Sequence, residues 1–156
     1  MTMTPAQQSA LEALAGRSLS ADDVAALGPM VDARRDDLIE AALNAGRTKY
    51  AETRKVEIGV IGAYAAGPVA ADALLAKLEG YAEAAQPLSR LVGRALKAMA
   101  VEPGLNLGDP STHAMLSALV AQSVITADEA EGLMAIARVP DPISRDVISR
   151  ALNKAV

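Results

Sequence analysis

The sequence contains no cysteine, tryptophan or phenylalanine, and it has one histidine. Without cysteine the chain offers neither disulfides nor thiolate ligands, and this composition fits a reducing cytosol. A hydrolase built on His113 would need a nucleophile and an orienting acid, and no nucleophile-elbow pattern is present. No histidine pair exists for a metal site, and paired acids such as Asp22/Asp23 fit helix N-termini, with an all-carboxylate site for a hard cation as the alternative. We therefore expect no enzymatic activity, no metal and no cofactor.

The residues that are present are mostly aliphatic. The 156 residues are 51% hydrophobic but only 2% aromatic, so leucine, isoleucine, valine and methionine must form the core. The abundant alanine is the strongest helix former and buries little area, which favours closely packed helices. Sandwiches and barrels use more β-branched and aromatic residues. The length suits a single helical domain over residues 1–156.

The overall charge is acidic. A formal net charge of −4 at pH 7 disfavours bulk attraction to nucleic acid or to an anionic membrane. The N-terminus lacks the charged and apolar regions of a signal peptide. The longest apolar stretch, Ile58 to Ala71, is too short to span a bilayer and contains Pro68. We expect a soluble protein that is cytoplasmic on synthesis and has no membrane partner.

Helix starts and ends are well marked. Hydroxyl residues followed three positions later by Gln, Asp or Glu predict capping boxes at Thr4, Ser20 and Thr126. Gly–Pro at 28–29 and Asn–Ala–Gly at 44–46 are typical of helix ends. We predict an all-α fold, a single compact bundle of about seven to eight short helices. Later helices are expected after Pro68, after Pro87, and over residues 111–122, 127–138 and 143–154.

One segment departs from the helical pattern. Residues 53–62 are rich in β-branched side chains, alternate in part, and contain Gly59 and Gly62. This composition is compatible with a strand, an extended arm or a glycine-weakened helix. We predict an extended or strand-like segment near 53–62, within an extended arm over 47–67.

Two parts of the chain resemble each other. Residues 19–27 and 125–133 share an apolar residue, a hydroxyl cap, an acid three positions later and a final leucine. Residues 37–44 and 146–153 are also similar. A duplicated helix pair would give repeat units at 19–44 and 125–153. Convergence of capping boxes in an alanine-rich and leucine-rich chain is the alternative.

Basic residues gather in two groups that are candidate interaction surfaces. The first group has spacing i, i+4, i+7, which places its members on one helix face, opposite an apolar stripe. The second group precedes the extended segment. A solvated surface is the common outcome for such charges, and docking on an acidic partner or a phosphate backbone is the functional alternative. The groups are Arg90, Arg94 and Lys97, and Arg47, Lys49, Arg54 and Lys55.

The C-terminal sequence has its own signal. Residues 142–153 resemble the turn and recognition helix of lac-repressor-type helix-turn-helix proteins, most closely in the final Ile-Ser-Arg-Ala-Leu-Asn. That resemblance implies a helix that lies in the major groove, with Arg145 and Arg150 as candidate contacts. Pro142 replaces the family's turn glycine, and Pro140 would break a preceding helix. A small DNA-binding regulator is therefore the alternative function.

Three short motifs relate the whole chain to another group. They are Ala45-Gly46-Arg47-Thr48-Lys49 followed by Ile58-Gly59, the box at 126–130, and Pro140-Asp141-Pro142 before the last helix. With them the chain resembles small alanine-rich proteins from the structural regions of tailed bacteriophages. The resemblance implies a virion or assembly component, in head–tail or tail assembly, that acts through helix packing and subunit contacts. Its partners would be further copies of itself or other virion proteins, and its location the virion.

Overall fold

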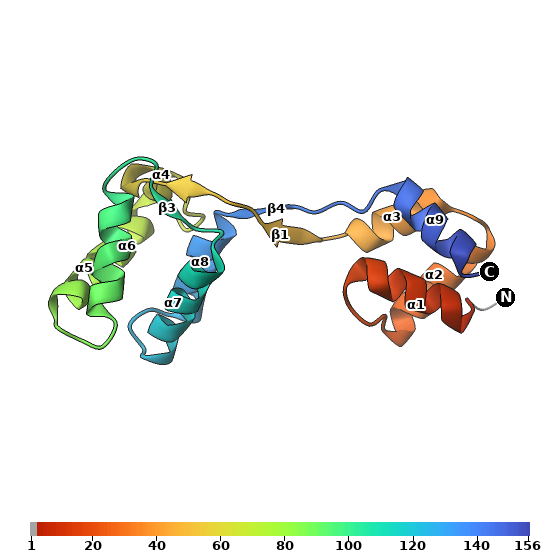
Figure 1. The fold of residues 1–156 in the computed structure, drawn as a ribbon, viewed down its shortest axis with the longest axis horizontal. Coiled ribbons are helices and arrows are strands. Elements are labelled where there is room, and N and C mark those ends of the chain that lie inside the picture. Colours follow the sequence, from red (N-terminus) through yellow and green to blue (C-terminus); the bar gives the residue numbers. More distant parts are fainter. Residues whose placement is uncertain (1–2) are drawn as a thin grey trace. The chain divides into compact units, whose positions relative to one another are not determined.

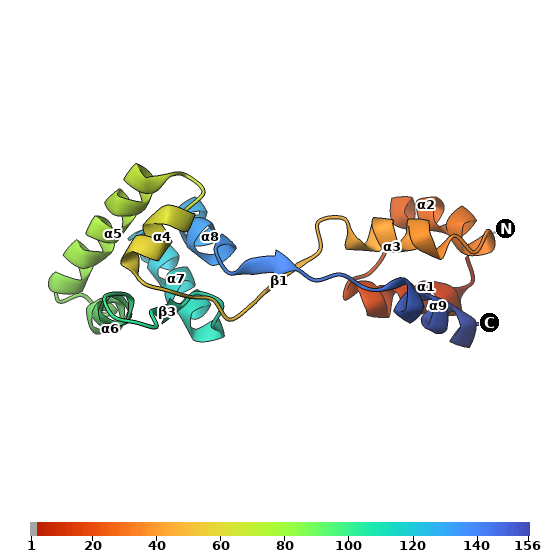
Figure 2. The same ribbon diagram turned by 90° about the horizontal axis from the view of Figure 1, so that it is seen from above.

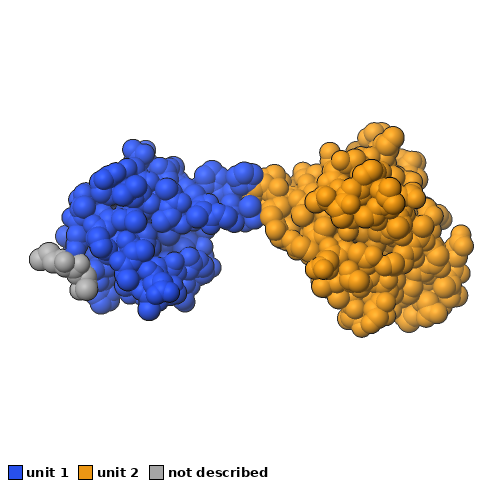
Figure 3. All heavy atoms as spheres, turned by 180° about the vertical axis from the view of Figure 1, so that it is seen from behind, with its two compact units in different colours: residues 1–48, 140–156 blue, residues 49–139 orange. Residues whose placement is uncertain are grey.

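The computed structural model describes residues 3–156 and divides them into two compact units. Unit 1 comprises the chain up to Thr48 together with Pro140–Val156, and unit 2 comprises Lys49–Val139 (Figure 3). Unit 2 is thus inserted in the sequence between two parts of unit 1. The described residues are mostly helical, as predicted, with nine helices against the seven to eight expected. That residues 1–156 act as one domain stays a prediction.

Unit 1 is a group of four helices within the described residues: three near the start of the chain and one at its end (Figure 1). The first and third helices both contact the last one, and the second contacts the third. Leu11, Ile39, Ile148 and Leu152 are fully buried at its centre. The helices are α1 (Pro5–Ala15), α2 (Ala21–Asp32), α3 (Asp36–Asn44) and α9 (Arg145–Lys154).

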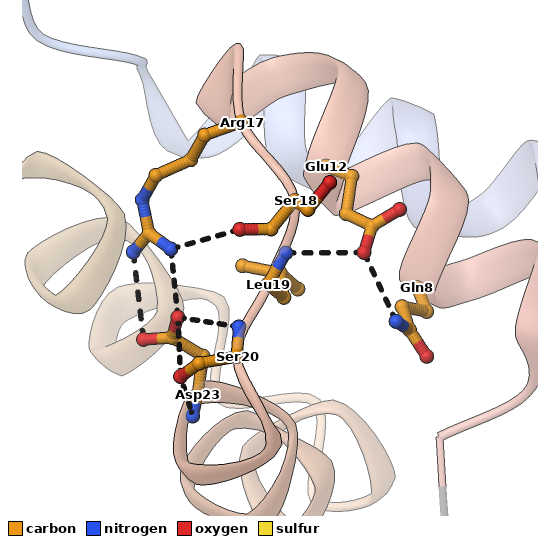
Figure 4. A network of polar contacts seen from close by, with 7 residues as sticks. All are labelled: Gln8, Glu12, Arg17, Ser18, Leu19, Ser20 and Asp23. Carbon is orange, nitrogen blue, oxygen red and sulfur yellow. Dashed lines mark hydrogen bonds and ion pairs between the residues drawn. The ribbon is translucent and has the colours of Figure 1, made fainter.

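The three predicted capping boxes are present, at Thr4, Ser20 and Thr126. In the second box, Asp23 accepts the backbone N–H of Ser20 at 2.9 Å and also pairs with Arg17 at 2.7 Å. Figure 4 shows these contacts closing the corner between α1 and α2. The hydrogen bonds and the ion pair of Asp23 thus fix the turn between the two helices.

The predicted end of α2 at Gly28-Pro29 is wrong. The helix continues to Asp32 with Pro29 inside it, and both Gly28 and Val31 are buried. An internal proline removes one backbone hydrogen bond. Burial of the final turn against the unit 1 core outweighs that loss, because Val31 belongs to the buried cluster.

Unit 2 contains the remaining helices of the described chain (Figures 1 and 2). The longest helix packs along its successor, and the last two helices pack together. A short antiparallel pair, with Arg54 opposite Asn106 and Lys55 opposite Leu105, contacts the helices at residues 57–63 and 89–99. The elements are α4 (Glu57–Ala63), α5 (Pro68–Glu83), α6 (Ser89–Met99), α7 (Pro110–Ala121), α8 (Ala127–Ala135), β2 (Arg54–Lys55) and β3 (Leu105–Asn106).

The core of unit 2 is aliphatic, as the composition predicts. Val60, Leu74, Val92, Leu116 and Leu119 are among its most deeply buried side chains. No helix within residues 3–156 has both the length and the apolar character needed to cross a membrane.

The prediction of an extended segment near 53–62 is confirmed only at β2, and it is wrong for the residues that follow. From Glu57 the chain forms α4, so the alternative of a glycine-containing helix holds for the rest. Val60 is fully buried in the core, and Glu57 lies in the first turn, where a negative charge favours the helix. Gly59 also permits close packing, since a Cβ there would lie 3.3 Å from Cδ of Lys55.

A second two-stranded sheet pairs β1 (Thr48–Tyr50) with β4 (Arg138–Pro140). The chain enters unit 2 at β1 and leaves it at β4. The predicted helix over 127–138 therefore ends early, at Ala135. In the proposed repeat, α2 and α3 pack together in unit 1, whereas α8 belongs to unit 2 and α9 to unit 1. A duplication of 19–44 and 125–153 stays a prediction.

Candidate interaction surfaces

Arg47 is a structural residue of unit 1. Its guanidinium donates to the carbonyl oxygens of Leu14 and Ala15, at 3.1 and 2.9 Å, and to the carbonyl and carboxylate of Asp141, at 2.8 and 3.0 Å. Leu14 and Ala15 end α1, where carbonyl groups lack partners within the helix. Its side chain is 26% exposed. Arg47 thus joins three segments of one unit, and four hydrogen bonds already occupy its guanidinium.

Two further hydrogen bonds join the segment around Arg47 to the segment around Asp141. The amide of Asn44 donates to the Ile143 carbonyl at 2.9 Å and accepts the Ile143 backbone N–H at 2.7 Å. Together with Arg47 and Asp141, this pair ties the segment that leaves unit 1 to the segment that returns to it. The polar residues at 44–47 therefore hold the two parts of unit 1 together.

The other members of the predicted arm group belong to unit 2. Lys49 is exposed in β1. Arg54 pairs with the carboxylate of Glu52 at 2.9 Å, and both side chains are largely exposed. Lys55 lies in β2 and its side chain covers Gly59. The structure therefore does not bring Arg47 and these three residues into one basic arm.

The second predicted group is one exposed surface. Arg90, Arg94 and Lys97 follow one another along α6, all three are exposed, and none makes an ion pair or hydrogen bond with the described residues. The helix sequence contains no acidic residue. The three charges thus share the exposed side of one helix, as their spacing indicates, and their role in binding a partner stays a prediction.

An apolar groove lies next to these charges. Among the described residues, Arg94 is the one charged residue that lines it, and Leu91, 45% exposed, forms part of its wall. We call it the α6 groove; its other lining residues are Ala95, Ala98, Leu105, Ser111, Thr112 and Met115. An apolar floor with a cationic rim is suited to an amphipathic protein surface.

A groove of opposite charge lies between α7 and α8, and sequence reasoning missed it. We call it the α8 groove; its lining residues are Ser117, Val120, Ala127, Asp128, Ala130, Glu131 and Met134. Asp128 is exposed and makes no ion pair with the described residues, whereas Glu131 pairs with Arg138. In sequence, acids at the start of a helix are explained by the helix N-terminus alone. Their spacing of three, followed by Met134, was the usable signal.

The neighbouring acid Glu129 has a structural role. Its carboxylate accepts from Nζ of Lys77 at 2.6 Å and from the Thr126 backbone N–H at 2.7 Å. The Lys77 ammonium and this backbone donor hold the pKa of Glu129 below its usual range. Glu129 therefore joins α5 to α8 and leaves Asp128 as the unpaired acid of that turn.

The C-terminal helix contributes one face to the unit 1 core. Ile148 and Leu152 are 0% exposed. On the exposed side, Arg145 lies 3.5 Å from Glu40, and Arg150 donates to the backbone carbonyl of Asp146. The preceding helix α8 ends at Ala135, so no helix directly precedes α9 as a helix-turn-helix motif requires.

His113 contacts backbone and an aromatic ring. Its Nε2 lies 2.7 Å from the Leu107 carbonyl, and its ring packs edge-on against Tyr50 with centroids 4.4 Å apart. The Ser111 hydroxyl bonds to Asp109 instead. These residues do not form the nucleophile–base pair of a hydrolase. Within residues 3–156, no three histidine or acidic side chains gather as metal ligands.

Comparisons of the chain with protein-family models, with curated proteins and with solved structures found no match.

Proposed function

We propose that the chain is a non-enzymatic structural protein that acts by contact in the head–tail or tail assembly of a tailed bacteriophage. The observation that carries this proposal is the pair of exposed grooves on unit 2, apolar on their floors and opposite in charge on their rims. Apolar patches with charged rims are typical of protein–protein interfaces. The phage context comes from the sequence resemblance.

The use of the polar side chains supports the same proposal. Arg47, Asn44 and Glu129 all bridge segments of the fold, and His113 is bonded to a backbone carbonyl. In an active site, such groups would be aimed at a substrate from a pocket with shifted pKa values. Here the cations along α6 and the acid Asp128 of α8 lie exposed without ion pairs among the described residues, as suits docking surfaces.

The test is the location of the chain in assembled particles. Particles from the native source are purified on a density gradient and their proteins quantified by mass spectrometry. We expect the chain to sediment with the particles in a fixed ratio to the other structural proteins. In particles disassembled under mild conditions, it should remain bound to one of them.

A soluble cytoplasmic protein from the same cells serves as the carry-over control. If the chain is found only in the soluble fraction, and neither mature particles nor assembly intermediates bind it, the proposal is wrong. Substrate turnover by the purified chain, abolished by His113→Ala, would also contradict it.

A further inference from the structure

We infer that copies of this chain bind one another head to tail, with the α6 groove of one copy seated on the α8 groove of the next. This inference rests on the proposed function and names the partner as a second copy. Both grooves combine an apolar floor with one sign of charge. The contact would bury Leu91 of one copy against Met134 and Val120 of the other.

Charge complementarity selects this partner. Arg94 lines the α6 groove, with Arg90 and Lys97 one turn before and after it on the same helix, and no acid of the described residues lines that groove. Asp128 and Glu131 line the α8 groove, Glu131 being paired with Arg138, and no basic residue of the described chain is among the lining residues. Opposite charges on facing patches favour the matched pair and penalise the pairing of two like grooves.

The placement of the grooves on α7 favours head-to-tail growth. Ser111, Thr112 and Met115 of this helix line the α6 groove, and Ser117 and Val120 line the α8 groove. At roughly 100° of rotation per residue, these two sets lie on nearly opposite sides of α7. The helix lies between α6 and α8 in both views (Figures 1 and 2). Each pair therefore leaves one groove of each kind free, and addition continues until a ring closes.

A nucleic acid fits the α6 groove less well. Single strands are held by aromatic platforms on which bases stack, together with basic residues. The groove wall is Leu, Ala and Met, without an aromatic residue. Covering this apolar floor with aliphatic side chains lowers the free energy of the complex, and the α8 groove supplies such side chains. Binding of nucleic acid at α6 is therefore an outcome that the experiment must exclude.

Charge reversal tests the contact. Sedimentation velocity over a concentration series to about 100 μM is run on the full chain, on Arg94→Glu, on Asp128→Lys, on their equimolar mixture and on the double variant. We expect the full chain to form species larger than a dimer. Each single variant should associate at least about tenfold more weakly. The mixture and the double variant should recover association, because the two reversed charges then face each other across the contact.

Two variants control for net charge. Lys154→Glu in unit 1 and Asp72→Lys on the exposed side of α5 make the same changes in charge outside both grooves, and both should associate like the full chain. Circular dichroism of every variant establishes that its helices are intact. If a single variant loses its helical signal, Arg94→Gln and Asp128→Asn replace it.

The results separate this inference from the proposed function. If the full chain is monomeric in solution but is found in particles, the head-to-tail contact is wrong and the structural role stands. If the chain associates with itself but is not found in particles, the head-to-tail contact stands and the structural role is wrong. Three results would overturn the head-to-tail contact. In the first, the control variants lose as much self-association as the groove variants, and in the second, the mixture does not recover it. The third result is a monomer that binds an oligonucleotide through Arg94.

Discussion

The ring of Tyr64 fills the space that a side chain at position 132 would need. A Cβ on Gly132 would lie 2.6 Å from Cε2 of Tyr64 and 2.8 Å from its hydroxyl oxygen. Tyr64 is 7% exposed and belongs to the core of unit 2, so the ring has little room to move. The segment after α4 is therefore packed directly on α8.

This contact predicts that Gly132→Ala destabilises unit 2. Forcing an extra methyl group into a packed core costs about 1–3 kcal/mol, which exceeds the gain in helix propensity from replacing glycine. We expect a lower free energy of unfolding in urea. In a Tyr64→Ala background the same substitution should cost much less, because the clash is gone.

Gly80→Ala is the matched control. Gly80 lies inside α5, is exposed, and has no atom within 4 Å of the added Cβ. There alanine should stabilise the chain by about 0.5–1 kcal/mol. If both alanines stabilise the chain equally, the packing of Tyr64 on Gly132 is wrong.

Replacement of Arg47 should loosen unit 1. Arg47→Met removes four hydrogen bonds, two to the end of α1 and two to Asp141. Hydrogen bonds to charged groups contribute about 1.5–3 kcal/mol each at most, and partial exposure reduces this. We expect a loss of roughly 2 kcal/mol, measured by urea unfolding.

Arg47→Lys separates charge from geometry. A lysine keeps the charge but cannot reach the two carbonyls and the carboxylate in one planar arrangement, so most of the loss should remain. Arg54→Met is the control, because its ion pair with Glu52 is exposed and such pairs contribute about 0–1 kcal/mol. Equal effects at positions 47 and 54 would contradict the role of Arg47.

The sequence predicted local features better than long-range ones. The capping boxes at Thr4, Ser20 and Thr126 were predictable because cap and partner are three residues apart. The role of Arg47 was not, since its partners lie up to 94 residues away. A basic run looks the same in sequence whether its charges face solvent or a buried carbonyl.

The two grooves were predictable in different degrees. The α6 charges repeat at helical spacing, so their common face follows from the sequence. The α8 groove needed the packing of α8 on α7, which no local pattern encodes. The helix α4 was missed because glycine and β-branched residues favour strands locally, and only burial of Val60 against the core decides for the helix.

Acid should weaken both the corner between α1 and α2 and the start of α3. Hydrogen bonds from Arg17 and Ser20 hold the pKa of Asp23 well below its usual 3.8, and Arg35 lowers the pKa of Asp37 to about 2. Groups with lowered pKa values stabilise the fold fully above the unfolded-state pKa. That stabilisation is lost as the pH falls toward the folded-state pKa. We expect the free energy of unfolding to fall between about pH 5 and about pH 2.

Asp23→Asn should flatten this decline, because the unfolded state then no longer takes up a proton at that position. Urea unfolding at a series of pH values measures the slope. Asp22→Asn makes the same change in net charge, and Asp22 has no ion pair or hydrogen bond in the described chain. An unchanged slope for Asp23→Asn, or the same change in both variants, would show that the Asp23 contacts do not govern acid stability.

We expect α9 not to bind DNA. Its apolar face is fixed in unit 1 by Ile148 and Leu152, and Arg145 on the exposed face is paired with Glu40. Sequence readout needs several side chains to reach base edges from a helix that docks beside a supporting one. We expect no mobility shift of duplex DNA by the full chain at low salt, and no difference for Arg145→Glu with Arg150→Glu. A shift that weakens with salt and disappears in that double variant would instead make α9 a recognition helix. The alternative of a DNA-binding regulator would then replace the structural role.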